Sequence, residues 1–192
     1  MRVCVFAASS NRVDERYYEA AGELGRMLAA SEMEVVFGGG GIGLMGRLAD
    51  AVLSNNGKIT GVIPRFMQDE GWGHSSVKEM IVTEGMPQRK QLMMQMADAI
   101  VALPGGIGTL EELAEAITLK QLGLFKGPIV ILNTLNFYDQ FLNFLEEMVR
   151  KNFMRKEHGE IWNVVNYPSE VIDSIRNYKG WYDNPRSFAK ID

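Results

Sequence analysis

Short apolar runs alternate with segments of helical periodicity along nearly the whole chain, and this alternation limits the fold more than any other feature. After the apolar run Val3–Ala8, for example, Val13, Tyr17, Leu24 and Leu28 recur at helical spacing on a polar background. Further apolar runs, typical of buried strands, lie at residues 34–37, 58–63, 80–83, 99–103, 128–132 and 162–165. Helices are predicted at 44–53, at 88–96, from the second glycine cluster to about residue 124, at 137–148 and at 169–178, whereas 65–78 is predicted to be irregular.

Strands that alternate with helices in this way build a mostly parallel sheet with helices on both faces. We therefore predict an α/β fold with a three-layer, doubly wound (Rossmann-like) sheet. The 192 residues contain no internal repeat or linker, which predicts a single α/β domain over residues 1–180 and a C-terminal tail over 181–192. In such sheets ligands bind beyond the carboxyl ends of the strands, so the loops at that edge are the candidate binding loops.

The composition argues against several classes of protein. The formal net charge of −4 offers no broad basic surface for nucleic acid or an anionic membrane. Cys4 is the only cysteine, so no intrachain disulfide can form, and its place in an apolar run is typical of a buried strand thiol. The chain starts directly with a strand, and no apolar stretch reaches the roughly 20 residues that span a bilayer. A cytoplasmic protein without nucleic-acid or membrane partners is therefore expected.

The first glycine cluster contains Gly41-Ile42-Gly43-Leu44-Met45-Gly46, which satisfies G-x-G-x-x-G at the opening of a helix. Glycines let backbone N–H groups approach a phosphate at the positive end of a helix, so Gly41 and Gly43 are candidate phosphate ligands. A dinucleotide fingerprint is disfavoured because the motif follows the second strand and no acid is placed for a ribose after the third. Two interpretations stay open: a site for a mononucleotide or sugar phosphate, and a tight turn that packs the helix against the strand.

The second cluster, Pro104-Gly105-Gly106-Ile107-Gly108-Thr109, follows a buried strand and opens the helix that contains Glu111 and Glu112. Its backbone donors and the Thr109 hydroxyl suit a phosphate, although no Gly-Lys-Ser/Thr follows as in a Walker A loop. The spacing Thr109-x-x-Glu112 also matches a capping box, and spacing alone favours that interpretation. A pocket role for Glu112 is sensible if its carboxylate faces a positive charge that develops on the ligand.

Chain geometry supplies a partner for Glu112. The helix at 88–96 should run antiparallel to the strand at 99–103, which brings its N-terminal residues Arg89 and Lys90 near the second glycine cluster. Arginine suits bidentate recognition of a phosphate, and lysine acts as a point charge. The alternative is that both cations lie on a solvated helix surface.

Other polar residues give weaker signals. His74 and His158, the only histidines, are not in a metal-ligand spacing, and no G-x-S-x-G elbow is present. Ser9 follows the first strand at the binding edge and is a candidate ligand contact, although a helix-entry turn fits equally well. Glu70 lies in the irregular segment at the same edge, where an ordinary surface loop is the default interpretation.

The stretches Gly38–Gly46, Met86-Pro87-Gln88-Arg89-Lys90 and Pro104–Glu112 closely resemble the LOG ("lonely guy") family of cytokinin riboside 5′-monophosphate phosphoribohydrolases. The resemblance covers nearly the whole chain, from residue 3 to about 178. It implies hydrolysis of the N-glycosidic bond of an adenine-type nucleoside 5′-monophosphate to the free base and ribose 5-phosphate, without a metal or organic cofactor. It also implies a homodimer with sites near the interface. Members are often labelled lysine decarboxylases, yet nothing here suggests a pyridoxal phosphate site.

The resemblance assigns roles to individual residues. Glu112 would be the essential acid and Arg89 its catalytic partner, with Lys90 beside it, while the loop from Gly106 to Thr109 would hold the 5′-phosphate. Thr118 matches a further ligand contact and Glu70 a base-side acid.

An ionised Glu112 could stabilise an oxocarbenium-like ribosyl centre and orient or deprotonate the attacking water. Arg89 could hold the phosphate or donate to the leaving purine. Two alternatives belong to other classes of protein. One is a nucleotide-binding or sensing protein without turnover, and the other is a dinucleotide-dependent oxidoreductase.

Overall fold

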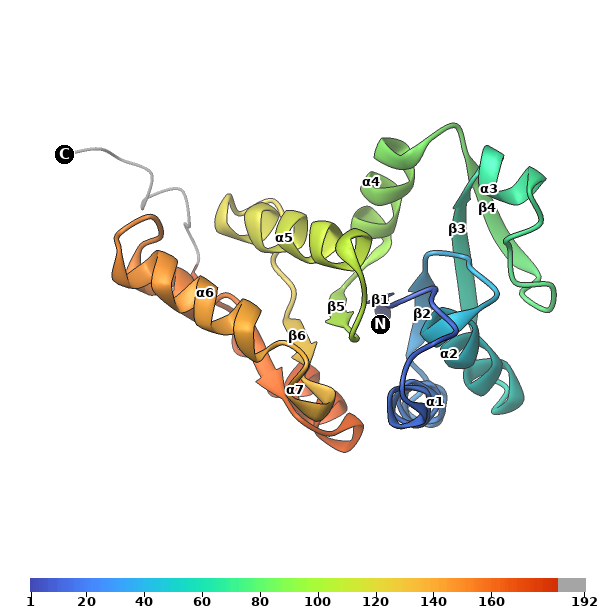
Figure 1. Cartoon of the computed structure of the whole chain (residues 1–192), viewed down its shortest axis with the longest axis horizontal. Coiled ribbons are helices and arrows are strands. Elements are labelled where there is room, and N and C mark those ends of the chain that lie inside the picture. Colours follow the sequence, from blue (N-terminus) through green and yellow to red (C-terminus); the bar gives the residue numbers. More distant parts are fainter. Residues whose placement is uncertain (183–192) are drawn as a thin grey trace.

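The computed structural model describes residues 1–182, and it contains a seven-stranded sheet in the order β4-β3-β2-β1-β5-β6-β7 (Figure 1). Every strand pairs with its neighbours in parallel. The predicted doubly wound α/β fold is therefore confirmed. The strands are β1 Arg2–Phe6, β2 Glu34–Phe37, β3 Ile59–Pro64, β4 Glu79–Thr83, β5 Ala99–Ala102, β6 Ile129–Leu132 and β7 Asn163–Val165.

Helices cover both faces of the sheet. The α-helices are α1 Glu15–Ala30, α2 Gly43–Ser54, α3 Arg65–Asp69, α4 Met86–Met96, α5 Ile107–Gln121, α6 Asp139–Arg150 and α7 Val171–Arg176. Short 3₁₀ turns lie at Thr134–Asn136, Lys156–Glu160 and Pro168–Glu170. No helix within residues 1–182 combines the length and the apolar character needed to cross a membrane.

The alternation of side chains along each strand divides the core into two layers. On β1, Val3 and Val5 pack with buried residues of α1, α2 and α7. Cys4 and Phe6 face the other way, into a layer formed with α4, α5 and α6. Both sets are almost fully buried, as expected for a parallel strand that is covered on both faces. The predicted environment of Cys4, a buried strand thiol, is confirmed.

Two segments differ from the predicted pattern. A five-residue helix, α3, occupies the start of the stretch predicted to be irregular, and none of its residues is buried. A short helix without a buried face has no apolar periodicity, so the sequence gives no signal for it. Trp181, the first residue of the predicted tail, donates its indole N–H to the Glu157 carbonyl at 3.0 Å. Residues 183–192 of that tail lie outside the described residues.

The order of the strands creates a switch point between β1 and β5. The chain moves outward from β1 to β4, then returns through α4 to place β5 on the other side of β1. Loops that leave β1 and β5 therefore diverge, and a crevice forms at the carboxyl ends of these strands. Both glycine clusters follow strands at this edge, as predicted.

Most of the first glycine cluster is needed for close packing of the backbone. Gly43 has φ +69°, and a Cβ on it would lie 2.6 Å from the Ser9 carbonyl carbon. The N–H of Gly41 donates to the Trp72 carbonyl at 3.0 Å, so it is not free to hold a phosphate. For Gly41 and Gly43 the structure thus supports the tight-turn interpretation rather than phosphate ligation.

This packing role predicts the effect of Gly43→Ala. A side chain there would combine a left-handed backbone with a collision against the backbone of the β1–α1 loop, so the free energy of unfolding should fall by about 2 kcal/mol or more. Urea denaturation of the ligand-free protein measures it. Gly159→Ala is the matched control, because a Cβ on Gly159 would meet nothing within 4 Å. An unchanged stability of Gly43→Ala would contradict the packing role.

Candidate active site

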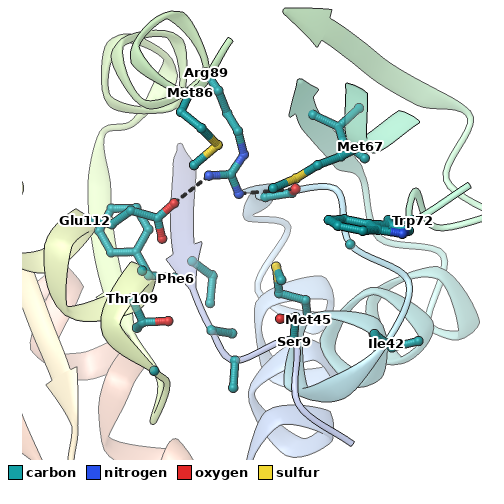
Figure 2. Close-up of a pocket in the computed structure, with 18 of the residues that line it drawn as sticks. Phe6, Ser9, Ile42, Met45, Met67, Trp72, Met86, Arg89, Thr109 and Glu112 are labelled. Carbon is teal, nitrogen blue, oxygen red and sulfur yellow. Dashed lines mark hydrogen bonds and ion pairs between the residues drawn. The ribbon is translucent and has the colours of Figure 1, made fainter. Parts of the chain in front are cut away.

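A pocket of about 580 Å³ opens in the crevice at the switch point (Figure 2). This volume falls within the usual range for small-molecule sites. The end of β1, the first glycine cluster, α3 and the loop after it, the start of α4 and the start of α5 all contribute to its walls. The lining residues are Val5, Phe6, Ala7, Ala8, Ser9, Gly38, Gly40, Ile42, Met45, Ile63, Met67, Trp72, Met86, Arg89, Gly106, Ile107, Gly108, Thr109 and Glu112.

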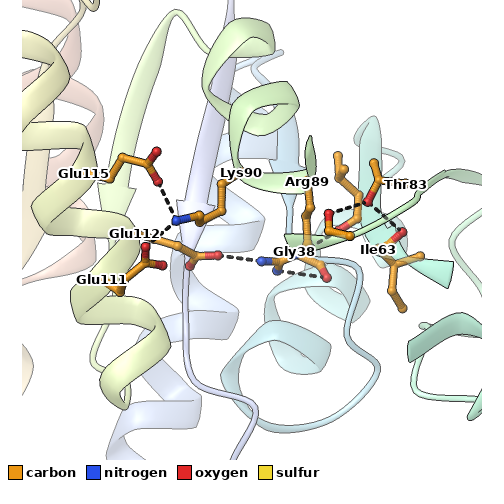
Figure 3. Close-up of polar contacts among 10 residues, drawn as sticks. Gly38, Ile63, Thr83, Arg89, Lys90, Glu111, Glu112 and Glu115 are labelled. Atoms are coloured by element: carbon orange, nitrogen blue, oxygen red, sulfur yellow. Dashed lines mark hydrogen bonds and ion pairs between the residues drawn. The ribbon is translucent and has the colours of Figure 1, made fainter. Parts of the chain in front are cut away.

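An ion pair between Arg89 and Glu112 forms one wall of the pocket. Arg89 Nη1 lies 2.7 Å from Glu112 Oε1, and the two side chains are only 7% and 10% exposed (Figure 3). Arg89 also donates from Nε to the Val62 carbonyl at 2.9 Å and from Nη2 to the Gly38 carbonyl at 3.2 Å. Because three acceptors fix the planar guanidinium, the Glu112 carboxylate is held in one place.

Gly38 is required by this arrangement. A Cβ on Gly38 would lie 2.0 Å from Arg89 Nη2, so any side chain there would displace the guanidinium. Gly38 itself is buried at the end of β2. Its place in the glycine cluster is therefore explained by the arginine that packs on it.

The capping-box prediction for Thr109 and Glu112 is wrong. Helix α5 begins at Ile107, its N-cap is Gly106, and no side chain caps it. Thr109 is thus already inside the helix, since the extended backbone of Gly106 allows the helix to start earlier than the spacing suggests. Glu112 lies three residues after Thr109 on the same side of the helix, and its carboxylate reaches Arg89.

Burial and charge act in opposite directions on Glu112. Burial raises the pKa of its carboxyl group above the ordinary value, and the positive charge and hydrogen bond of Arg89 oppose that rise. The apolar surroundings therefore favour the protonated form of Glu112, while the fixed cation favours its ionised form. This combination suits a group that takes up a proton during a reaction.

The start of α5 lies beside this pair and presents backbone N–H groups to the pocket. Gly106, Ile107, Gly108 and Thr109 line the pocket, and the N–H groups of a first helical turn have no acceptor within the helix. A Cβ on Gly106 or Gly108 would meet nothing within 4 Å, so a ligand can reach the backbone there. The positive end of the helix dipole favours a phosphate in this position.

Gly105 has a different role from its neighbours. A Cβ on it would lie 2.1 Å from Thr109 Oγ1, so the glycine makes room for the Thr109 side chain. Gly105 does not belong to the lining residues. It positions the loop without contacting the pocket.

Several residues predicted for the site lie outside the pocket. Lys90 forms ion pairs with Glu111 and, at 3.0 Å, with Glu115, because adjacent helical residues point about 100° apart and only Arg89 faces the pocket (Figure 3). The exposed Thr118 donates its hydroxyl to the Ala114 carbonyl at 2.8 Å. Glu70 is exposed and follows α3 as its C-cap residue. Ser9, by contrast, does line the pocket.

The apolar wall of the pocket was not predicted from the sequence. Its side chains come from β1, α2, α3, the loop after α3, and α4, and the larger ones are Phe6, Ile42, Met45, Met67, Trp72 and Met86. In the sequence the methionines were indistinguishable from core residues. A signal was available for Ile42 and Met45, since both belong to the glycine cluster at the carboxyl edge of the sheet.

The arrangement combines three chemical features in one pocket: an anion site at a helix N-terminus, a buried carboxylate held by an arginine, and an apolar wall. Within residues 1–182, no group of three or more His, Cys, Asp or Glu side chains is placed to hold a metal ion. The pocket therefore presents groups that can bind an anion at one end and an apolar surface at the other.

Comparisons with known proteins agree with this description of the pocket. The sequence model of a family described as "Possible lysine decarboxylase" matches residues 45–175. The chain is 38% identical to the cytokinin riboside 5′-monophosphate phosphoribohydrolase LOG of Oryza sativa subsp. japonica, an alignment that covers 98% of this chain and 81% of the rice protein. It is 40% identical to the corresponding enzyme LOG2 of Arabidopsis thaliana, over 95% of this chain and 86% of the relative.

Solved structures support the fold. The molybdenum cofactor carrier protein of Chlamydomonas reinhardtii superposes with a TM-score of 0.71, covering 92% of this chain and 96% of the carrier, at 21% identity. At that identity the likeness establishes a shared architecture only. The sequence relatives are phosphoribohydrolases and align over nearly the whole chain. This chain therefore belongs to the LOG family of phosphoribohydrolases.

Proposed function

We propose that this protein hydrolyses the N-glycosidic bond of adenine-type nucleoside 5′-monophosphates, releasing the free base and ribose 5-phosphate. The observation that carries the proposal is the buried Arg89–Glu112 pair beside the open N-terminus of α5. The names of the relatives support the same reaction on cytokinin riboside 5′-monophosphates. A nucleoside monophosphate whose base carries an isoprenoid group and AMP itself are the substrates we expect.

In this proposal the 5′-phosphate binds at the first turn of α5. The N–H groups of Ile107, Gly108 and Thr109 and the Thr109 hydroxyl donate to its oxygens. Glu112 lies one turn further along the helix, so the ribose of a substrate held this way comes next to its carboxylate. Arg89 holds that carboxylate and offsets the negative charge that the phosphate brings to the pocket.

The reaction at C1′ uses a single carboxylate, that of Glu112. As the C1′–N9 bond breaks, its electron pair leaves with the base and positive charge develops on the ribosyl group. The ionised Glu112 stabilises that charge and takes a proton from the water whose oxygen attacks C1′. Glu112 is the only acid among the lining residues, so we assign the proton that the departing base needs to solvent entering the open pocket.

A decarboxylase assignment lacks support in the pocket. Lysine decarboxylation with pyridoxal phosphate needs a lysine amine for the Schiff base. None of the residues that line the pocket is a lysine, and the nearby Lys90 is held by Glu111 and Glu115. We infer that the description of the family model does not name the reaction of this chain.

We also propose that the protein is a homodimer with its sites near the interface, as the resemblance to the LOG family implies. Large apolar side chains such as Leu124, Phe144 and Phe153, which are 60%, 57% and 85% exposed, are available to be covered by a second copy. The catalytic pair itself is complete within one chain.

The role of Glu112 predicts the effect of Glu112→Gln. The change keeps the size and one hydrogen-bond acceptor for Arg89 but removes the negative charge, so the protein should still fold, with a lower free energy of unfolding, and kcat should fall about 100-fold or more. Chromatography of AMP and isopentenyladenosine 5′-monophosphate after incubation measures the released base. Glu111→Gln is the control, because Glu111 is half exposed and pairs with Lys90 outside the pocket.

Two results would contradict this assignment. Full activity in a well-folded Glu112→Gln protein would remove Glu112 from the mechanism. Binding of AMP by the wild-type protein without any release of adenine over hours would favour the nucleotide sensor instead of an enzyme.

The pKa of Glu112 gives a second test. Because burial raises it, the carboxylate is lost as the pH falls through a value above the ordinary 4.5, and activity should be lost with it. Nuclear magnetic resonance of glutamate labelled with ¹³C at Cδ follows this titration, with Glu112→Gln identifying the signal. Replacing Arg89 with Met should move the midpoint further upward, since Arg89 is the main opposing influence. A midpoint at or below 4.5 in the wild-type protein would contradict the predicted environment.

A further inference from the structure

Tyr138 is a buried tyrosine whose hydroxyl reaches the central sheet. It stands immediately before α6, and only 1% of it is exposed. Its hydroxyl donates to the Leu103 carbonyl at 2.7 Å. Burial raises the pKa of this hydroxyl above its ordinary value, so it stays protonated and remains a donor at any ordinary pH. Leu103 follows β5 and directly precedes Pro104, so the bond lies where the sheet ends and the second glycine cluster begins.

The backbone hydrogen bonds of the sheet run out at this point. The register of β5 with both neighbouring strands ends one residue before Leu103. The Leu103 N–H still donates to the Phe6 carbonyl at 2.9 Å, and the Ala8 N–H donates to the Pro104 carbonyl at 3.3 Å, which is long for such a bond. The Tyr138 hydroxyl therefore adds a short bond from a side chain just beyond the last paired residues of β5.

The turn that carries Tyr138 is strained and held by side-chain bonds. Leu135 has φ 54° and Asn136 has φ 60°, in the left-handed region that is unfavourable for leucine. Asn133 secures the turn, because its Oδ1 accepts from the Tyr138 N–H at 2.7 Å and its Nδ2 donates to Asp139 Oδ1 at 2.8 Å. Strained backbone persists only where the surrounding structure imposes it. Here the strained turn places the Tyr138 hydroxyl against the end of β5.

The bond to Leu103 acts at a short distance along the chain from the first turn of α5. Only three residues, two of them glycine, separate Leu103 from Ile107, where the helix begins. Because glycine restricts the backbone little, the position of such a link depends on what fixes its two ends. The ion pair of Glu112 with Arg89 and the buried face of α5 fix one end. The bond from Tyr138 fixes the other.

We propose that Tyr138 is a positioning residue for phosphate binding at the start of α5. This inference rests on the proposed function. Its hydroxyl holds the Leu103 carbonyl, and thereby the N–H groups of residues 107–109, in the place that a phosphate requires. Tyr138 does not line the pocket, so it acts through the backbone and not by touching the ligand. Without the hydroxyl the Leu103 carbonyl loses this donor, the end of β5 relaxes, and the affinity for phosphate falls.

The test compares Tyr138→Phe with the wild-type protein by calorimetry, with ribose 5-phosphate and adenosine as ligands. The change keeps the ring and removes only the hydroxyl. It should weaken binding of ribose 5-phosphate about fivefold, the scale of one hydrogen bond, and change that of adenosine less than twofold. With AMP as the substrate, KM should rise about fivefold while kcat stays within about twofold.

Two further variants support the comparison. Tyr17→Phe is the matched control, because Tyr17 packs edge-on against Phe137, the neighbour of Tyr138, and lies outside the pocket. It should leave every value unchanged. Asn133→Ala removes the acceptor of the Tyr138 N–H and should give the same selective loss for ribose 5-phosphate, which keeps the proposal testable if Tyr138→Phe folds poorly.

The outcomes separate this proposal from the proposed function. Equal losses for ribose 5-phosphate and adenosine, or no loss for either, would overturn the role of Tyr138, because a purely structural role does not single out the phosphate. A wild-type protein that binds ribose 5-phosphate but releases no base from AMP would refute the hydrolase assignment alone. A wild-type protein that binds neither ribose 5-phosphate nor AMP would overturn both.

Discussion

A guanidinium and a carboxylate that are both buried depend on each other, because either charge alone would be strongly destabilising in an apolar pocket. Arg89 and Glu112 meet this condition at the point where β1 and β5 diverge. Arg89 also donates to the carbonyl groups of Gly38, just after β2, and of Val62, within β3. The pair thus connects α4 and α5 to the sheet, and the geometry of the pocket depends on it.

The positions of the glycines in both clusters are explained by the geometry of this site. Gly38 leaves space for the guanidinium, and Gly105 leaves space for the Thr109 side chain at the start of α5. Gly106 and Gly108 instead leave the backbone open toward the pocket. Two clusters that look alike in the sequence therefore serve different ends: the first packs an arginine and a loop, and the second exposes helix N–H groups for an anion.

The sequence was sufficient for the fold and for the pair at the centre of the site. Alternation of apolar runs and helical periodicity determined the parallel sheet, and the antiparallel course of α4 and β5 brought Arg89 near Glu112. The spacing of Thr109 and Glu112 could not decide whether they form a capping box. The answer depends on where the helix begins, which is set by the extended backbone of Gly106 and is not encoded in the spacing. Two further features could not be predicted for a related reason, the orientation of Lys90 away from the pocket and the place of Trp72 in its wall. The direction of a side chain depends on tertiary packing, which spacing along the chain does not encode.

The central claim is that Glu112 faces the ribosyl carbon of a nucleotide whose phosphate binds at the N-terminus of α5. A crystal structure of Glu112→Gln with isopentenyladenosine 5′-monophosphate bound tests it most directly. We predict phosphate oxygens within about 3 Å of the N–H groups of Ile107, Gly108 and Thr109. We also predict a water molecule between the side chain of residue 112 and C1′, within about 3.5 Å of that carbon and opposite the base. A phosphate bound elsewhere, or a C1′ turned away from residue 112, would contradict the account.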